Sequence, residues 1–446
     1  MKTLKKKYGL WTSIAMVIGI VIGSGVFFKA DDVLTLTNGN LTLALLAWVV
    51  GAIAMIFGAL VFAEFAQRIE KSNGIVDYSE EAYGKKFGYL AGWFNGVLYY
   101  TPLSAILAWV AAMYTLVLFG NTNPDNSSMT WILAAIYMIS IYLMNYFSPI
   151  LAGKFQVTTT IIKLIPLLLL AIVGSISGIA NGIMFENFSQ AAKTIGSSSG
   201  SFASAVVATA FAYEGWIIAI SINNEIKDSK KNLPKALTIG SIIIFVVYIT
   251  YFLGVAGVLT TDKIVSEGNN AISIASNSLF GSVAATILIA FVVISCLGTL
   301  NGLILSSIRM PFALAVRNQG PMPKLLSKIN HKTDMPPYST LYAFALSAIY
   351  LIIWFGSLNN WFGKYIGLDE IPIVLVYGLY ILLYFWYMKN FKDLNKWKRF
   401  GRPILATLGA LVILYGGITN PSIGINLFIC FIVILSGLFF YRKQID

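Results

Sequence analysis

The chain has 446 residues, of which 57% are hydrophobic and 11% are charged, and its mean hydropathy is +0.77. These values exclude an ordinary water-soluble domain and indicate an integral membrane protein. A formal charge of +12 is also typical of nucleic-acid-binding proteins, so the positions of the basic residues must distinguish the two classes.

Apolar stretches of about 20 residues recur along the whole chain, and a helix needs that length to cross about 30 Å of hydrocarbon. The first stretch has a lysine-rich approach like that of a signal peptide, but without a small-residue cleavage site, so we expect it to be retained. The sequence therefore predicts an all-α protein with twelve transmembrane helices, at 9–31, 41–67, 87–119, 130–148, 157–179, 202–224, 236–259, 272–307, 339–356, 371–388, 402–418 and 422–441.

The first span contains the stretch GIVIGSGVFF, which works against helix formation at its centre. Glycine costs a helix about 1 kcal/mol relative to alanine, so Gly23, Ser24 and Gly25 weaken the span locally. One interpretation is close packing of two helices, because Gly19 and Gly23 are four residues apart. The other is a break in the helix, which frees backbone N–H groups that suit a carboxylate.

The fifth span contains a charged residue, Lys163, in the stretch IIKLIPL. Its side chain could extend to the interface, but the predicted span places it several residues inside the membrane. The alternative is that the Lys163 ammonium lies against carbonyls freed by broken helices, where a sodium ion binds in other transporters. A fixed cation there would remove the need for sodium.

The sixth span contains the stretch FAYEGW, from Phe211 to Trp216, about ten residues from either end of the span. An aromatic belt is the simple interpretation, but belts lie at the interface. A carboxylate such as Glu214 at mid-membrane costs on the order of 2.5 to 3.5 kcal/mol on insertion scales. We therefore expect a functional reason for its position.

The two interrupted spans run in opposite directions, because the first is odd-numbered and the sixth even-numbered. Glycine-interrupted segments at corresponding positions of two oppositely oriented halves indicate a transporter site between inverted repeats. We expect spans 1–5 and 6–10 to form these repeats in a core of residues 1–390, with an appended hairpin at 391–446. Free N–H groups and free carbonyls together suit the zwitterion of an α-amino acid.

The basic residues are distributed asymmetrically across the predicted membrane. With a cytoplasmic N-terminus, all but five of the 31 Lys and Arg residues lie on the cytoplasmic side. The exceptions are Lys163 and the outer residues Lys29, Lys193, Lys263 and Lys364. This bias predicts that both termini are cytoplasmic and that the basic charge faces anionic lipid, with no nucleic-acid partner.

Few residues in the sequence suit catalysis or metal binding. The only histidine is His331, and no group of Cys, His, Asp or Glu has metal-ligand spacing. Cys296 and Cys430 both lie in predicted spans, so no disulfide framework is expected. We therefore expect that the protein binds no cofactor and is not an enzyme. The scarcity of ionisable residues at mid-membrane depth also argues against a channel.

The three motifs above, together with CLGTLNGLILSSIRMPFALAVRNQGPMPKLLSKI in and after span 8, resemble the L-amino acid transporter family of the amino acid, polyamine and organocation superfamily. The resemblance covers nearly the whole chain. It implies the twelve-helix leucine-transporter fold with helices 1 and 6 unwound mid-membrane, alternating access, and sodium-independent exchange of L-amino acids in the cell membrane.

The resemblance also assigns roles to individual residues. Three backbone amides would hold the substrate carboxylate, those of Gly23, Ser24 and Gly25. Three backbone carbonyls would face its amino group, those of Val21, Phe211 and Glu214. Phe211 would also be the aromatic gate that covers the substrate.

Three further residues match the family pattern outside this site. Lys163 matches the fifth-span lysine that ties the break in span 1 to span 5. Asn301 and Arg309 match the pattern of span 8, as structural or gating residues rather than ligands.

The sequence departs from the family pattern at three places. The loop GNTNPDNSSMT between spans 3 and 4 lacks the cysteine of members that pair with a glycoprotein heavy chain, so no disulfide-linked heavy chain is expected. Glu214 stands where some members have a small residue, which favours a smaller pocket or a cationic substrate. Asn318, Gln319 and Gly320 replace the usual Glu-Gly, and the sequence offers no interpretation of this change.

These observations predict an exchanger of small neutral L-amino acids that works by alternating access. Glu214 leaves two alternatives open. A carboxylate beside the pocket suits a cationic amino acid or a polyamine, and a buried Glu214 or Lys163 suits proton symport.

Overall fold

The computed structural model describes residues 6, 8–23, 25–69, 74–121, 123–194, 202–363, 366–368, 371–419 and 423–442. Within these ranges the regular structure is helical, and strand-type pairing is limited to two isolated bridges, Tyr8 with Ile226 and Asn330 with Met335. Ten of the described helices are long and apolar enough to cross a membrane. The predicted all-α, multi-pass membrane architecture is thereby confirmed.

The ten long helices, some built from consecutive shorter elements, account for most of the chain. They are α4 (Leu41–Arg68), α6 with α7 (Lys85–Leu118), α8 (Ser128–Phe147), α9 with α10 (Pro149–Ala180), α13 (Ser229–Val258), α16 (Ser282–Ala315), α18 (Pro337–Leu358), α19 (Ile371–Asn390), η6 with α20 (Trp397–Ile418) and α21 (Ile423–Phe440). The composite helix at Lys85–Leu118 contains a π-helical stretch, η1 (Asn95–Tyr100), ahead of α7 (Thr101–Leu118).

Two shorter apolar segments are interrupted. In the first, α1 (Leu10–Val21) is followed by α2 (Gly25–Phe28) and α3 (Ala30–Leu36), with a bend of 41° between α1 and the continuation. In the second, α12 (Phe202–Tyr213) ends at a turn and continues as the 3₁₀ helix η4 (Trp216–Glu225). Gly215 in that turn has φ +106°, a left-handed conformation that glycine adopts without steric cost.

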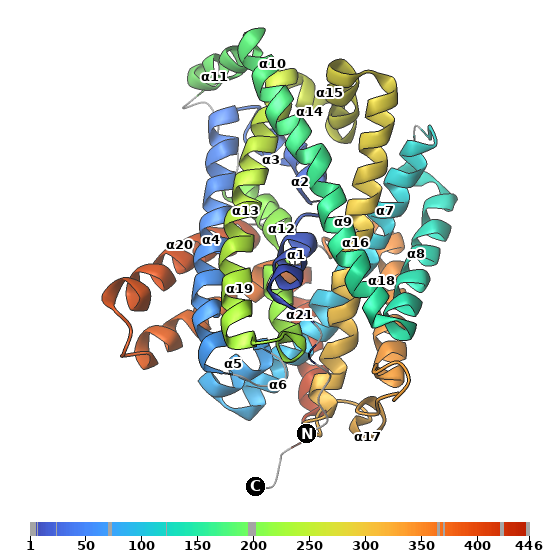
Figure 1. Cartoon of the computed structure of the whole chain (residues 1–446), viewed down its shortest axis with the longest axis vertical. Coiled ribbons are helices and arrows are strands. Elements are labelled where there is room, and N and C mark those ends of the chain that lie inside the picture. The colour runs from blue at the N-terminus through green and yellow to red at the C-terminus, as the bar shows by residue number, and fades with distance from the viewer. Residues whose placement is uncertain are drawn as a thin grey trace.

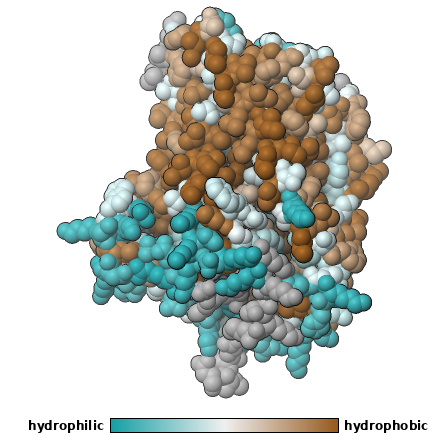
Figure 2. All heavy atoms as spheres, in the orientation of Figure 1, coloured by the Kyte–Doolittle hydropathy of each residue, from teal (hydrophilic) through white to brown (hydrophobic). Residues whose placement is uncertain are grey.

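The segment α1 lies near the centre of the molecule, among α9, α13 and α16 (Figure 1). Short helices occupy both ends of the long ones: α11 (Ile183–Thr194), α14 (Thr261–Glu267) and α15 (Ala271–Phe280) lie at one end, and α5 (Gly74–Tyr83) and α17 (Pro323–Leu326) at the other. Hydrophobic side chains cover most of the face seen in Figure 2, and hydrophilic ones gather at the end that carries α5 and α17.

The predicted span 272–307 was wrong as a single helix. The chain breaks at Gly281, whose φ of +81° ends α15 at Phe280, and α16 then runs from Ser282 to Ala315. A left-handed glycine directly after a helix is a common stop, and hydropathy alone does not detect it because the flanking residues are apolar.

Both ends of the described chain are fastened near the same end of α16. Close to the N-terminus, the Tyr8 amide donates to the Glu225 carbonyl at 2.9 Å, and Glu225 forms a buried ion pair with Arg309 of α16 at 2.5 Å. Burial and, to a smaller extent, the nearby Glu225 raise the pKa of the Tyr8 phenol to about 12, so this hydroxyl stays protonated.

Close to the C-terminus, Gln319 pairs with the backbone of Arg442 through both halves of its amide. Gln319 Nε2 donates to the Arg442 carbonyl at 2.6 Å, and the Arg442 amide donates to Gln319 Oε1 at 2.9 Å. A glutamate at this position could accept from the amide but could not donate to the carbonyl. This contact gives a structural reason for the glutamine that the sequence left without interpretation.

Candidate functional site

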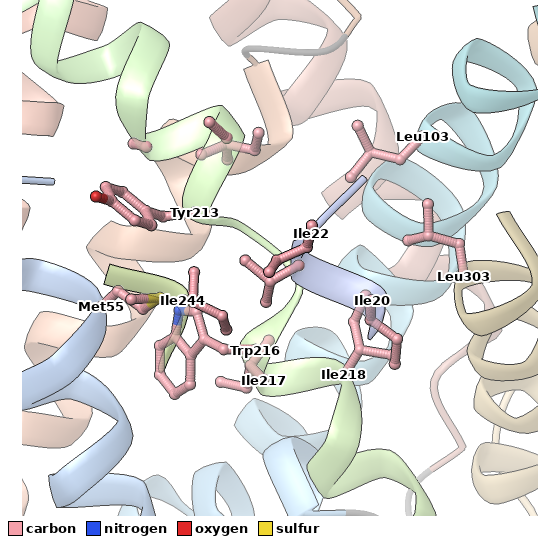
Figure 3. Close-up of a cluster of buried hydrophobic side chains, with 14 of the residues drawn as sticks. Ile20, Ile22, Met55, Leu103, Tyr213, Trp216, Ile217, Ile218, Ile244 and Leu303 are labelled. Carbon is pink, nitrogen blue, oxygen red and sulfur yellow. The ribbon is translucent and has the colours of Figure 1, made fainter. Parts of the chain in front are cut away.

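A cavity of about 400 Å³, including space open to solvent, lies where the two interrupted segments meet. Figure 3 shows Ile20 at the end of α1 with Ile218, Leu103 and Leu303 around it. The lining residues come from α1 and the residues after it, from the end of α12 and the start of η4, and from η1, α7, α16 and α19: Ile20, Val21, Gly23, Gly25, Tyr99, Leu103, Leu107, Phe211, Ala212, Glu214, Gly215, Ile218, Thr299, Leu303 and Ile373.

The glycines of the two interruptions let the segments touch directly. A Cβ atom on Gly25 would lie 2.7 Å from the Cα atom of Ala212, and a Cβ on Gly215 would lie 2.9 Å from Cγ2 of Ile20. Both separations are shorter than a carbon–carbon contact allows. The first interruption therefore packs against the second at two points, and a side chain at either glycine would push the segments apart.

Gly19 and Gly23 have a packing role as well, as the four-residue spacing predicted. A Cβ on Gly19 would lie 2.0 Å from Oγ1 of Thr160 in α9, and a Cβ on Gly23 would lie 2.6 Å from Oγ1 of Thr299 in α16. Both interpretations therefore apply to this segment. The glycines allow close packing against α9 and α16, and the helix also ends at Val21.

Lys163 reaches from α9 to the end of α1, and its side chain does not extend to the membrane interface. The residue is 0% exposed, and Nζ donates to the Gly19 carbonyl at 2.6 Å and to the Ile22 carbonyl. The last carbonyls of a helix have no partner within it and carry its negative dipole end, so they favour a cation.

Two hydroxyl side chains of α16 bind the same carbonyls. Thr299 Oγ1 lies 3.3 Å from the carbonyl oxygens of both Gly19 and Ile22, and Ser295 Oγ lies 3.4 Å from that of Ile22. Neither residue could be identified from the sequence, since a single Ser or Thr in an apolar span gives no distinguishing signal. The end of α1 is thus bound by side chains of two other helices.

Tyr248 of α13 connects the ends of both interrupted helices. Its hydroxyl lies 2.9 Å from the Val21 carbonyl of α1 and 3.0 Å from the Ala212 carbonyl of α12, and its one proton is shared between them. Nothing in the sequence distinguishes this residue, because a tyrosine within an apolar span is most simply explained by packing. The Val21 carbonyl, predicted as a substrate ligand, therefore already has a protein donor.

Glu214 lines the cavity and is only 6% exposed. The Tyr99 hydroxyl donates to its Oε1 at 2.5 Å, while Oε2 has no hydrogen-bond partner among the described residues. Charge-assisted hydrogen bonds are the stronger kind, so Tyr99 offsets part of the cost of burying this carboxylate. Tyr99 is another residue that sequence analysis did not find.

Phe211 also lines the cavity, and its ring is half-buried. Its carbonyl accepts from the Glu214 amide at 3.2 Å, and the Lys29 ammonium lies 5.2 Å from the centre of its ring. Lys29 pairs with Asp32 at 3.2 Å. Of the predicted ligands, Ser24 alone lies outside the described residues, while Val21, Gly23, Gly25, Phe211 and Glu214 all line the cavity.

Asn301 and Arg309 lie away from the cavity lining. Asn301 bonds to Gln156 and to Asn145, each at 2.9 Å, and so joins α16 to α9 and α8. Arg309 pairs with Glu225 at the end of η4. Both contacts fasten elements together, which fits structural or gating residues better than ligands.

Comparison with known proteins gives a consistent result. The amino acid permease family model matches residues 8–438. The chain is 32% identical to the serine/threonine exchanger SteT of Bacillus subtilis (strain 168) over 382 residues, 86% of this chain and 82% of the relative. It is 31% identical to the human large neutral amino acids transporter small subunit 2 over 376 residues, 80% and 68% of the two chains. It is 27% identical to the human b(0,+)-type amino acid transporter 1 over 442 residues, 98% and 88%.

Proposed function

The chain belongs to the amino acid permease family, and we propose that it exchanges small neutral L-amino acids across the cell membrane, without sodium, by alternating access. Its family makes it a membrane transporter of amino acids and not an enzyme. The names of the serine/threonine exchanger and the large neutral amino acids transporter support exchange and neutral substrates. Serine, threonine and alanine are the first substrates to test.

The proposed architecture is a twelve-span fold. Ten of the described helices are long and apolar enough to cross a membrane, and we propose that the interrupted segments at 10–36 and 202–225 each form one further span. In this arrangement the interrupted segments are the first and sixth spans, unwound mid-membrane, of two inverted repeats in residues 1–390, and 391–446 form an appended hairpin. The direct packing of Gly25 on Ala212 supports the placement of a site between the repeats.

The proposed substrate binds with its carboxylate at the backbone amides of Gly23, Ser24 and Gly25, and with its ammonium facing the carbonyls of Phe211, Glu214 and Val21. Phe211 is the proposed gate. The apolar side chains of Leu103, Ile218 and Leu303 would then surround the substrate side chain.

The observation that carries the proposal is the position of Lys163. Its ammonium donates to the carbonyls of Gly19 and Ile22 at the end of α1, so a side chain of the protein occupies the place where a transported ion would otherwise neutralise the helix end. A site that contains its own cation has no electrostatic need for sodium.

Exchange into proteoliposomes tests this proposal. Vesicles loaded with serine should take up labelled serine, threonine and alanine rapidly, vesicles without internal amino acid should take up little, and replacing sodium by choline should leave the rates unchanged. Uptake that needs a sodium gradient, or that ignores internal amino acid, contradicts the proposal.

Glu214 supports a second candidate function, which has two forms. The first is transport of a cationic amino acid or a polyamine, and the second is proton-coupled symport of amino acids. The residue lines the cavity, and its Oε2 atom has no hydrogen-bond partner among the described residues, so this carboxylate could pair with a second ammonium or take up a proton. Competition by arginine against labelled serine tests the first form. Uptake into empty vesicles under a pH gradient tests the second.

We also propose that both termini are cytoplasmic and that no disulfide-linked heavy chain is needed. Tyr8 and Arg442 both form hydrogen bonds near the same end of α16, which supports placing the two termini on the same side of the membrane. The loop at 120–130 contains no cysteine, and Cys296 and Cys430 are buried. Purified protein without a partner should therefore be active in the exchange assay.

A further inference from the structure

A second pocket lies between α6 (Lys85–Phe94) with η1, α16 and α18, toward the end of the molecule that carries α17 and the marked chain termini (Figure 1). It measures about 350 Å³, including space open to solvent. We call it the inner pocket, because this end faces the cytoplasm in the proposed orientation. No described residue lines both the inner pocket and the central cavity, so the two are separate sites.

The inner pocket opens between helices that cross the membrane. Its partly exposed lining residues include Val97 of η1, Pro311 of α16, and Tyr342 and Leu346 of α18. All three elements belong to helices that are long and apolar enough to span a bilayer. The opening is therefore accessible to the hydrocarbon chains of surrounding lipids.

The polar side chains that line the inner pocket are almost all used within the protein. Trp93, Thr101 and Ser307 each donate a hydrogen bond to a backbone carbonyl, at 2.9, 2.9 and 2.8 Å, and the Gln319 amide pairs with the backbone near the C-terminus. The remaining one, Tyr342, lies at the partly exposed side. Water needs two to four polar partners to occupy a cavity, so the interior of this pocket suits a hydrocarbon chain better.

The segment that connects α16 to α18 at the edge of the inner pocket is basic. Residues 316–336 include four Lys or Arg residues and a single acidic residue. Arg317 forms an ion pair with α5, whereas Lys324, Lys328 and Lys332 are exposed. Basic clusters beside membrane-spanning helices attract the anionic headgroups of the cytoplasmic leaflet. The charge at this edge therefore complements an anionic phospholipid.

Two of these lysines lie close to the pocket itself. The Lys328 ammonium is 5.9 Å from the centre of the Tyr338 ring at the start of α18. Tyr338 comes one helical turn, or roughly 6 Å, before Tyr342 on the same face of α18, and Tyr342 lines the pocket. Lys324 belongs to α17, whose Leu326 also lines the pocket. A headgroup at these lysines would place its acyl chains beside the opening.

We propose that the inner pocket binds an anionic phospholipid of the cytoplasmic leaflet, with one acyl chain between η1, α16 and α18 and the phosphate group at Lys324 and Lys328. The chain lies against Val97 of η1, two residues before Tyr99, whose hydroxyl donates to Glu214 in the central cavity. The lipid thus contacts the π-helical stretch that carries a residue of the transport site. This inference uses the proposed orientation but does not require exchange of amino acids.

Thermal unfolding of the purified protein in a neutral detergent tests the lipid site. Dioctanoyl phosphatidylglycerol should raise the midpoint of unfolding in a saturable way, because a ligand of the folded state stabilises it. Dioctanoyl phosphatidylcholine, which has the same chains and no net charge, should have little effect. Leu346→Trp, which fills the open side of the pocket, should abolish the shift. The double variant Lys324→Gln/Lys328→Gln should raise the half-saturating concentration of phosphatidylglycerol about tenfold to thirtyfold.

Each variant has a matched control. Ile349→Trp introduces the same side chain at an exposed position of α18 outside the pocket lining, and Lys392→Gln/Lys396→Gln removes two exposed lysines that follow α19. Both should respond to phosphatidylglycerol like the unmodified protein.

Equal shifts with the two lipids would overturn the anionic site, and a normal shift in Leu346→Trp would overturn its location in the inner pocket. Lys324 and Lys328 are exposed, so the lysine variants decide the question if Leu346→Trp does not fold. A protein that binds phosphatidylglycerol but does not exchange serine would refute the proposed function and leave this site intact.

Discussion

The two interrupted segments are stabilised in different ways. At the end of α1, the free carbonyls of Gly19 and Ile22 are bound by side chains from other helices, above all by Lys163. At the end of α12 two hydrogen bonds are local, because the Glu214 amide donates to the Phe211 carbonyl and the Ile218 amide to the Gly215 carbonyl at 3.0 Å. The only side chain from another helix that binds a carbonyl there, among the described residues, is Tyr248, which binds that of Ala212. The first interruption is held by a charged residue of another helix, Lys163 of α9, whereas the second contains its own charged residue, Glu214.

This difference shows how broken backbone is tolerated within a membrane. Every peptide group there needs a partner, and it must come either from a neighbouring element or from the local turn. The first interruption is therefore sensitive to changes in α9 and α16, which hold it from outside. The second should respond mainly to changes at Gly215, Glu214 and the tyrosine that binds Glu214.

The largest expected effect comes from forcing the two interruptions apart. Gly25→Val places a branched side chain where even a Cβ atom would lie 2.7 Å from the Ala212 Cα atom. Overpacking of this kind costs about 1–3 kcal/mol, and it would also fill the space proposed for the substrate carboxylate. We expect serine binding and exchange to be abolished, as measured by isothermal titration and by uptake into proteoliposomes.

The matched control for Gly25→Val is Gly424→Val in α21, where an added Cβ meets nothing within 4 Å. This variant should bind serine like the unmodified protein. Retained serine affinity in Gly25→Val would contradict both the carboxylate site and the close contact between the interruptions.

The next largest effect is expected from Lys163→Ala. Its removal leaves the carbonyls of Gly19 and Ile22 without a cation, and each hydrogen bond to a charged group is worth about 1.5–3 kcal/mol. We expect exchange to slow by about 100-fold, the equivalent of roughly 2.7 kcal/mol, with a smaller change in the temperature of unfolding. Initial uptake rates and thermal melts in detergent measure the two quantities.

Lys154→Ala is the control, since Lys154 lies on the same helix but is exposed. It should transport at the normal rate. A well-folded Lys163→Ala variant with normal exchange would show that the end of α1 needs no cation. The proposed difference in how the two interruptions are stabilised would then be wrong.

Much of the fold and part of the candidate site could be predicted because their signals are local in sequence. Composition and span length predicted a multi-pass helical protein, and the glycines near Gly25 and Gly215 identified segments that the structure brings together. Lys163 and Glu214 were found because a charge within an apolar span is costly and therefore noticeable.

The rest depends on contacts between distant parts of the chain. Tyr99, Tyr248 and Thr299 are ordinary residues of apolar helices, and only the folded arrangement brings their hydroxyl groups to Glu214 and to the ends of α1 and α12. The break at Gly281 was missed for a different reason, since a left-handed glycine between two apolar helices does not change the hydropathy.

Tyr248→Phe is expected to have a moderate effect that tests the link between the interruptions. The change removes the hydroxyl shared by the Val21 and Ala212 carbonyls and keeps the ring that stacks on Tyr213. A neutral hydrogen bond is worth about 0.5–1.5 kcal/mol, so exchange should slow by about fivefold to tenfold. Tyr251→Phe is a suitable control, since the Tyr251 hydroxyl has no hydrogen-bond partner among the described residues. Equal rates for the two variants would separate Tyr248 from the transport cycle.

The smallest effect is expected from Glu214→Gln, which sharpens the comparison at the second interruption. Glutamine keeps an oxygen that accepts from Tyr99 but removes the charge, so the turn should persist and serine exchange should slow by only about threefold, the size of a weakened hydrogen bond. Tyr99→Phe, which removes the donor and keeps the charge, should have a similar effect. Competition by arginine and uptake under a pH gradient are measured in both variants. If Glu214→Gln alone abolished inhibition by arginine or proton-driven uptake, the charge at the second interruption would serve the substrate or the proton, and neutral exchange would no longer describe the protein.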